Sequence, residues 1–207
     1  MFPPRILLMR HGQVRQQDPR RFLGQQDVVL DATGRQQAEL AGQRLQGLDI
    51  GLALCSDLIR AEETAKTVLR GREVELMADP RLREICLGQW QGLTQQEVEE
   101  RFPGEHEARG ADLAGFRPTG GESFRDVQLR AKSCLEELPL SQGNVLVVAH
   151  SGVNRTLLCH ALGLDLAGLF SFGQDYCCLN VLLPETEGGA GWRVDQLNYP
   201  LGRETVL

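Results

Sequence analysis

The chain has 207 residues, a net charge of −6, and hydrophobic and charged fractions of 42% and 24%. This length suits one domain, and the composition is ordinary for a globular protein. The acidic balance gives no sign of a nucleic-acid partner or of attraction to an anionic membrane. No apolar run is long enough to span a bilayer, and the N-terminus lacks a signal-peptide pattern, so we expect a cytoplasmic protein.

The six cysteines are scattered along the sequence, and no two of them form a Cys-x-x-Cys pair. In a reducing compartment such cysteines usually act as small core residues. A metal site would require paired ligand spacing, which this sequence lacks. We therefore expect no bound metal.

The first third of the chain reads as strands alternating with helices. Residues 6–9 form a continuous apolar run, which predicts a strand buried on both faces of a sheet. The polar stretch 13–26 predicts a loop, and apolar residues at helical spacing predict a helix over 31–47. A short buried strand at 52–55 leads into a helix whose apolar face spans 58–68.

The middle of the chain has weaker signals. Residues 73–77 are compatible with a short strand, and Thr94 with Glu97 forms a capping box that opens a helix. Residues 103–121 are rich in Gly and Pro, which predicts irregular structure. We expect an inserted flap at about 93–121.

The last third returns to alternating elements. A capped helix is predicted over 123–138, and the apolar run 145–149 is the strongest strand signal in the sequence. Ser151 can cap the helix that follows, and further strands are predicted at 178–183 and 192–197. We expect one α/β domain over the whole chain, a three-layer α/β/α sandwich with a mostly parallel sheet.

Polar side chains follow three of the predicted strands. Arg10 and His11 follow the first strand, Arg60 follows the second, and His150 follows the strand at 145–149. Because the carboxyl ends of parallel strands meet at one edge, these side chains would lie together. Arginines hold phosphoryl oxygens and a histidine can attack phosphorus, while Glu84 is the best candidate to protonate a leaving alkoxide. An Arg-His pair that merely ends a strand is the structural alternative.

The residues at these junctions resemble, in order, motifs of the histidine phosphatase (phosphoglycerate-mutase-like) superfamily. Similarity extends from about residue 6 to residue 183 and includes four motifs: Arg10-His11-Gly12, Ser56-Asp57-Leu58-x-Arg60-Ala61-x-x-Thr64-Ala65, Leu82-Arg83-Glu84-x-x-x-Gly88-x-x-x-Gly92 and Val148-Ala149-His150-Ser151-Gly152-Val153-x-Arg155.

The resemblance implies a phosphoglycerate-mutase-like fold, no metal or organic cofactor, and specific catalytic roles. His11 would be the phosphorylated nucleophile, with Arg10, Arg60 and His150 around the phosphate. Glu84 would be the proton donor and later the base that activates water. Further substrate contacts are implied at Gln17, where many relatives carry asparagine, and at Gly24, Gln25 and the backbone of Ser151.

The resemblance also implies a small phosphorylated metabolite as substrate. Segments 117–124 and 21–24 resemble the alpha-ribazole phosphatase and broad-specificity branch, which makes alpha-ribazole 5'-phosphate a candidate. A cofactor-dependent phosphoglycerate mutase is one alternative, although mutases have a longer insertion with a basic cluster. A non-catalytic regulatory member is another, although all five catalytic positions are present. A homodimer stays open beside a monomer.

Overall fold

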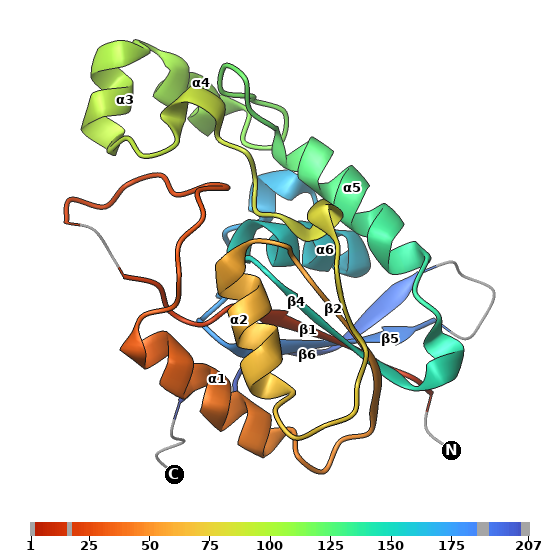
Figure 1. The fold of residues 1–207 in the computed structure, drawn as a ribbon. Helices are drawn as coiled ribbons and strands as arrows, with labels where there is room; N and C mark the ends of the chain where they lie inside the picture. The colour runs from red at the N-terminus through yellow and green to blue at the C-terminus, as the bar shows by residue number, and fades with distance from the viewer. Residues whose placement is uncertain (1–2, 16–17, 186–190, 204–207) are drawn as a thin grey trace.

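The computed structural model describes residues 3–15, 18–185 and 191–203 (Figure 1). One six-stranded sheet has the order β3-β2-β4-β1-β5-β6. Its strands are β1 (Ile6–Arg10), β2 (Ile50–Cys55), β3 (Leu76–Ala78), β4 (Asn144–Ala149), β5 (Cys178–Pro184) and β6 (Trp192–Pro200). The first four run parallel, whereas β5 and β6 are antiparallel to their neighbours. The prediction of a mostly parallel sheet is confirmed.

Helices cover both faces of the sheet, as Figure 1 shows. Leu7 and Met9 of β1 pack with α1 (Ala32–Arg44) and α2 (Ile59–Val68), while Ile6 and Leu8 pack with α5 (Phe124–Glu136) and α6 (Ser151–Leu162). Successive side chains of a strand point to opposite faces, so an uninterrupted apolar run serves two cores at once. The predicted three-layer sandwich is confirmed.

The segment between β3 and α5 lies on the side of the sheet that α5 and α6 cover (Figure 1). It holds the short 3₁₀ helices η1 (Pro80–Leu82) and η2 (Gly88–Trp90), then α3 (Gln95–Arg101) and α4 (Glu105–Ala111), which lie at the upper left of Figure 1. The prediction that 103–121 is irregular is wrong where α4 forms. This helix places no side chain fully inside the described core, so the sequence shows no apolar periodicity there.

The helices differ in how the backbone N–H groups of their first turns are satisfied. The predicted capping box of Thr94 and Glu97 is confirmed, and Ser123 with Asp126 forms a second one at α5. The prediction that Ser151 caps α6 is wrong, because His150 occupies the cap position. The N-cap residues of α2 and α6 make no side-chain cap bond; instead, Asp27 accepts from the N–H of Ile59 at the start of α2, and Glu84 accepts from the N–H of Gly152 at the start of α6.

Two further 3₁₀ helices, η3 (Leu140–Gln142) and η4 (Leu166–Gly168), lie in the connections around β4 and α6. β3 is shorter than the predicted strand 73–77 and lies at the sheet edge. Within the described ranges, no helix combines the length and apolar character needed to cross a membrane.

Candidate active site

The sheet brings the predicted histidines together. β1 and β4 are parallel neighbours with Arg10 opposite Ala149, and the backbone N–H of His11 donates to the carbonyl of Ala149 at 3.0 Å. His11 and His150 follow these two strand ends directly. Their ring centroids are therefore only 5.1 Å apart, which confirms that the strand order places both side chains at one point.

His11 is held in a defined tautomer. Its Nδ1 lies 2.7 Å from the carbonyl oxygen of Gly12, and the residue is only 4% exposed. Because a carbonyl can only accept, Nδ1 must carry the proton of a neutral ring. The lone pair is then on Nε2, which is the arrangement a nucleophilic imidazole requires.

Burial and nearby cations keep both histidines neutral. Desolvation lowers the pKa of His11 well below its usual value of 6.5, and the positive charges of Arg10 and Arg60 lower it further. The pKa of His150 is lowered in the same way by burial and then by Arg60. Without an anion beside them, two neutral rings are thus expected at pH 7.

Several buried nitrogens of the site have no hydrogen-bond partner among the described residues. They belong to a group of four residues that we call the histidine–arginine cluster: Arg10, His11, Arg60 and His150. Four fully buried side-chain nitrogens lack a hydrogen-bond partner within the described part of the chain. They are Nε of Arg10, Nε of Arg60, and both ring nitrogens of His150. Each such group typically costs about 1–3 kcal/mol, so their concentration in one cluster indicates a polar ligand.

The loop before α1 closes over Arg60. This side chain is 1% exposed and donates from Nη1 to the carbonyl of Gln26 at 2.8 Å and from Nη2 to that of Gly24 at 2.9 Å. Gly24 has a φ of +54°, and a Cβ there would collide with the side chain of Gln91. The predicted substrate residue Gly24 therefore lies directly against the cluster.

The other predicted substrate residues have different outcomes. Gln25 donates from Nε2 to the backbone carbonyl of Glu84 at 2.9 Å, so it joins two parts of the site. Ser151 lies in the first turn of α6, and its hydroxyl accepts a hydrogen bond from Arg155. Gln17 lies outside the described residues.

Glu84 reaches the start of α6 from a separate loop. One carboxylate oxygen accepts from the backbone N–H of Ile85 at 2.9 Å, and the other accepts from that of Gly152 at 3.1 Å. A Cβ at position 152 would collide with this carboxylate, which explains the glycine there. The best candidate proton donor from the sequence thus contacts the backbone two residues after His150.

Two residues near the cluster were missed by sequence reasoning. Arg10 donates from Nη1 to the carbonyl of Gln174 at 2.5 Å, and its guanidinium carbon lies 3.8 Å from the centroid of the Tyr176 ring. Both residues precede β5, whose start reaches this edge because it runs antiparallel to β1. No local pattern reveals that orientation.

A buried partner, the side chain of Asn180 in β5, holds Gln174 in place. Gln174 and Asn180 exchange hydrogen bonds of 2.8 and 3.0 Å through their side chains. Asn180 also donates to the backbone carbonyl of Leu8 in β1 at 3.1 Å. The segment that holds Arg10 is thereby fixed to the sheet.

The composition of the site limits what could bind there. In the described ranges, no three or more His, Cys, Asp and Glu side chains are grouped so as to hold a metal ion. Cys86, two residues after Glu84, is half-buried with its sulfur 3.8 Å from the carbonyl of Gly120. The cluster itself offers guanidinium and imidazole nitrogens, which suit an anion.

A buried group of guanidinium and imidazole nitrogens beside a glutamate side chain suits one class of protein, the phosphoryl-transfer enzymes that act through an imidazole. The sequence profile of the "Histidine phosphatase superfamily (branch 1)" matches residues 6–199. The chain therefore belongs to this family, and it is a phosphomonoesterase of that superfamily.

Individual relatives support the same family and differ in their named substrates. The chain is 31% identical over 180 residues to phosphoserine phosphatase 1 of Hydrogenobacter thermophilus, covering 86% of this chain and 85% of the relative. It is 35% identical over 190 residues to a protein named probable 2-carboxy-D-arabinitol-1-phosphatase from Arabidopsis thaliana, covering 90% of this chain but 39% of that longer protein.

The fold is also found in solved structures. The alpha-ribazole phosphatase of Shigella flexneri superimposes with a TM-score of 0.85 at 26% identity, covering 95% of this chain and 96% of that one. The arrangement of sheet and helices is therefore that of the family.

Proposed function

We propose that the protein hydrolyses a small phosphorylated metabolite through a covalent phosphohistidine formed on His11. The observation that carries the proposal is the group of unpartnered buried nitrogens on Arg10, Arg60 and His150, next to an imidazole whose Nδ1 is already bonded. The non-bridging oxygens of a phosphoryl group would satisfy these nitrogens.

The proposed reaction has two steps. In the first, a bond forms between Nε2 of His11 and phosphorus, the bond from phosphorus to the leaving oxygen breaks, and protonated Glu84 gives its proton to that oxygen. In the second, a water oxygen bonds to phosphorus, Glu84 takes the proton of that water, and the bond from phosphorus to Nε2 breaks. The enzyme then returns to its starting state.

The substrate is narrowed by the comparisons but not fixed by them. We propose alpha-ribazole 5'-phosphate as the first metabolite to test, because segments 117–124 and 21–24 resemble that branch and because the Shigella alpha-ribazole phosphatase shares the fold over nearly its whole length. Phosphoserine is the second, on the similarity to phosphoserine phosphatase 1.

The first experiment compares hydrolysis of p-nitrophenyl phosphate, with EDTA present, by the wild type and His11→Ala. His160→Ala is the matched control, because His160 is a half-buried histidine at the far end of α6. We expect metal-independent turnover in the wild type and the control, and loss of about 10⁴-fold or more in His11→Ala. Acid quench and mass spectrometry would detect the phosphohistidine.

Activity that persists in His11→Ala would contradict the proposed nucleophile. A wild type that interconverts 3- and 2-phosphoglycerate in the presence of 2,3-bisphosphoglycerate, without releasing phosphate, would instead identify a mutase. A wild type that binds inorganic phosphate but turns over none of the phosphomonoesters above would favour a regulatory protein.

A further inference from the structure

Glu84 differs from the histidine–arginine cluster in the way it is supported. His11 and His150 directly follow strands of the sheet, whereas Glu84 lies in the connection between η1 and η2. We call residues 79–88, which include η1 and this connection, the Glu84 loop. A group that transfers a proton must stay within hydrogen-bond reach of the reacting oxygen. The Glu84 loop therefore needs an external support.

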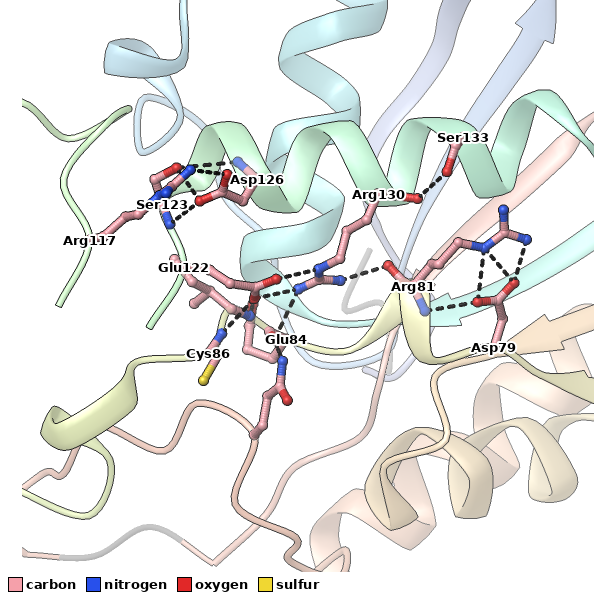
Figure 2. A network of polar contacts seen from close by, with 12 residues as sticks. Asp79, Arg81, Glu84, Cys86, Arg117, Glu122, Ser123, Asp126, Arg130 and Ser133 are labelled. Atoms are coloured by element: carbon pink, nitrogen blue, oxygen red, sulfur yellow. Dashed lines mark hydrogen bonds and ion pairs between the residues drawn. The ribbon is translucent and has the colours of Figure 1, made fainter. Parts of the chain in front are cut away.

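Figure 2 shows that support at the side of α5. Arg130 donates from Nη1 to the backbone carbonyl of Arg81 at 2.6 Å and from Nη2 to that of Glu84 at 3.2 Å. Glu122 accepts from the backbone N–H of Cys86 at 2.8 Å, and its own N–H donates to the carbonyl of Cys86 at 2.8 Å. The backbone is thus held before, at and after Glu84.

Arg130 and Glu122 also hold each other. Nε of Arg130 donates to one carboxylate oxygen of Glu122 at 2.8 Å, and Nη2 donates to the other at 3.0 Å. The two side chains are 18% and 24% exposed, so solvent screens this pair less than the ion pairs at the surface. A bidentate pair of this kind fixes orientation as well as distance.

The pair connects the Glu84 loop to a rigid element. Glu122 directly precedes the Ser123 capping box, and Arg130 lies within α5, whose residues Val127 and Ala131 are fully buried. The position of the loop is therefore set by a helix that packs on the sheet. The Glu84 carboxylate itself accepts hydrogen bonds from the backbone N–H groups of Ile85 and Gly152, and these contacts depend on the loop staying in place.

We propose that Arg130 and Glu122 are positioning residues that keep Glu84 in place through both of its proton transfers. The inference rests on the proposed function, in which Glu84 is the acid and then the base. Neither residue needs to touch the substrate. Their loss should weaken proton transfer and leave phosphate binding intact.

Leaving groups of different acidity separate these effects. The nitrophenolate ion leaves without a proton, whereas the alkoxide of glycerol 1-phosphate needs one from Glu84. A mispositioned Glu84 should therefore slow the first step for the alkyl ester only. The second step, in which Glu84 activates water, should slow for both substrates, so that the phosphohistidine accumulates during turnover of p-nitrophenyl phosphate, whose first step is not slowed.

The experiment uses the full-length protein and the variants Arg130→Gln, Arg130→Lys and Glu122→Gln, with Glu84→Gln as the reference for a lost acid. Arg117→Gln is the matched control, because Arg117 forms a 2.5 Å ion pair with Asp126 near the start of the same helix rather than with Glu122, which holds the Glu84 loop. Stopped-flow and steady-state rates are measured with both substrates, together with inhibition by orthovanadate.

We expect Arg130→Gln to lower kcat for glycerol 1-phosphate by about 10- to 100-fold, a part of the usual contribution of a general acid. With p-nitrophenyl phosphate, the rate of the nitrophenolate burst should stay within about threefold of wild type while its amplitude rises, as in Glu84→Gln. The vanadate inhibition constant should change little, whereas KM for p-nitrophenyl phosphate should fall because the second step then limits turnover. Arg130→Lys should recover part of the loss, and Arg117→Gln should behave as wild type.

Equal losses of the burst rate and of the alkyl rate would overturn the proposal, as would a large rise in the vanadate constant. A third outcome would refute this inference alone. In that outcome the wild type is active and Glu84→Gln shows the leaving-group effect, but Arg130→Gln and Glu122→Gln do not. A wild type without turnover would refute the proposed function and the inference together. Thermal melts identify any variant that fails to fold. If Arg130→Gln fails, the inference is tested with Arg130→Lys and Glu122→Gln, which change the pair less.

Discussion

The histidine–arginine cluster and the Glu84 loop belong to one site but are held in different ways. The cluster lies at the ends of parallel strands and at helix starts, and His11, Arg60 and His150 are almost fully buried while Arg10 is partly buried. The Glu84 loop has little regular structure and is held by half-buried side chains from α5 and from residue 25. One region is fixed by the sheet and the other by a polar network.

This difference matches the task of each region. Binding a phosphoryl group requires preorganised charges at fixed positions, and burial strengthens them because less solvent screens them. Proton transfer requires one carboxyl group to serve two different oxygens in turn. Changes in the cluster should therefore affect binding and chemistry together, whereas changes around the loop should affect proton transfer alone.

Among the variants that compare the two regions, the largest effect is expected for Arg60→Lys. Lysine keeps the charge but lacks the fork that holds the carbonyls of Gly24 and Gln26, so the covering loop is weakened together with the proposed contact to phosphate. We expect kcat/KM for p-nitrophenyl phosphate to fall about 10²- to 10³-fold. Inhibition by inorganic phosphate should weaken in parallel. A loss confined to kcat would contradict the expectation that changes in the cluster affect binding and chemistry together.

The support beneath the cluster should also matter for stability. Asn180→Leu removes both side-chain hydrogen bonds between this residue and Gln174, and it removes the acceptor of the Asn198 backbone N–H, all at a fully buried position. We expect the free energy of unfolding to fall by about 2–3 kcal/mol, as measured by urea denaturation. Gln96→Ala, which removes an exposed hydrogen bond to Glu100 in α3, should cost less than about 0.5 kcal/mol. Equal costs would show that the cluster is not specially supported.

The neutral histidines predict a pH dependence. Burial lowers the pKa of His150 in the folded protein, so below pH 6.5 the unfolded chain binds a proton that the folded protein does not. Stability should therefore be lost as the pH falls from 7.5 to 5.5, by about 1.4 kcal/mol for this residue. Urea denaturation of His150→Gln should show a smaller decrease over that range. An unchanged decrease would mean that the folded protein accepts this proton.

Apart from the controls, the smallest effect is expected at the N-cap of α3. Thr94→Ala removes the hydroxyl that accepts from the backbone N–H of Glu97 at the start of α3. We expect a loss of about 1 kcal/mol in the free energy of unfolding, with kcat unchanged. A large loss of activity would show that the segment around α3 helps to hold the reacting groups.

Local patterns were enough to predict much of this molecule. The apolar run before Arg10 and the run before His150 predicted two buried strands with reactive ends, and both strands are present. The Thr94 and Ser123 caps were predicted because a capping box involves only neighbouring residues. Short-range periodicity and caps lie in the sequence itself, and the resemblance of the motifs supplied the candidate roles.

The tertiary structure decided what depends on distant parts of the chain. Tyr176 meets Arg10 only because β5 pairs antiparallel with β1, and Arg130 reaches Glu84 across 46 residues of sequence. α4 shows no apolar stripe, so its formation left no periodic signal. Strand order, strand direction and long side-chain contacts arise from global packing. The sequence by itself thus determined which groups could react, whereas the folded chain decided which residues hold them in place.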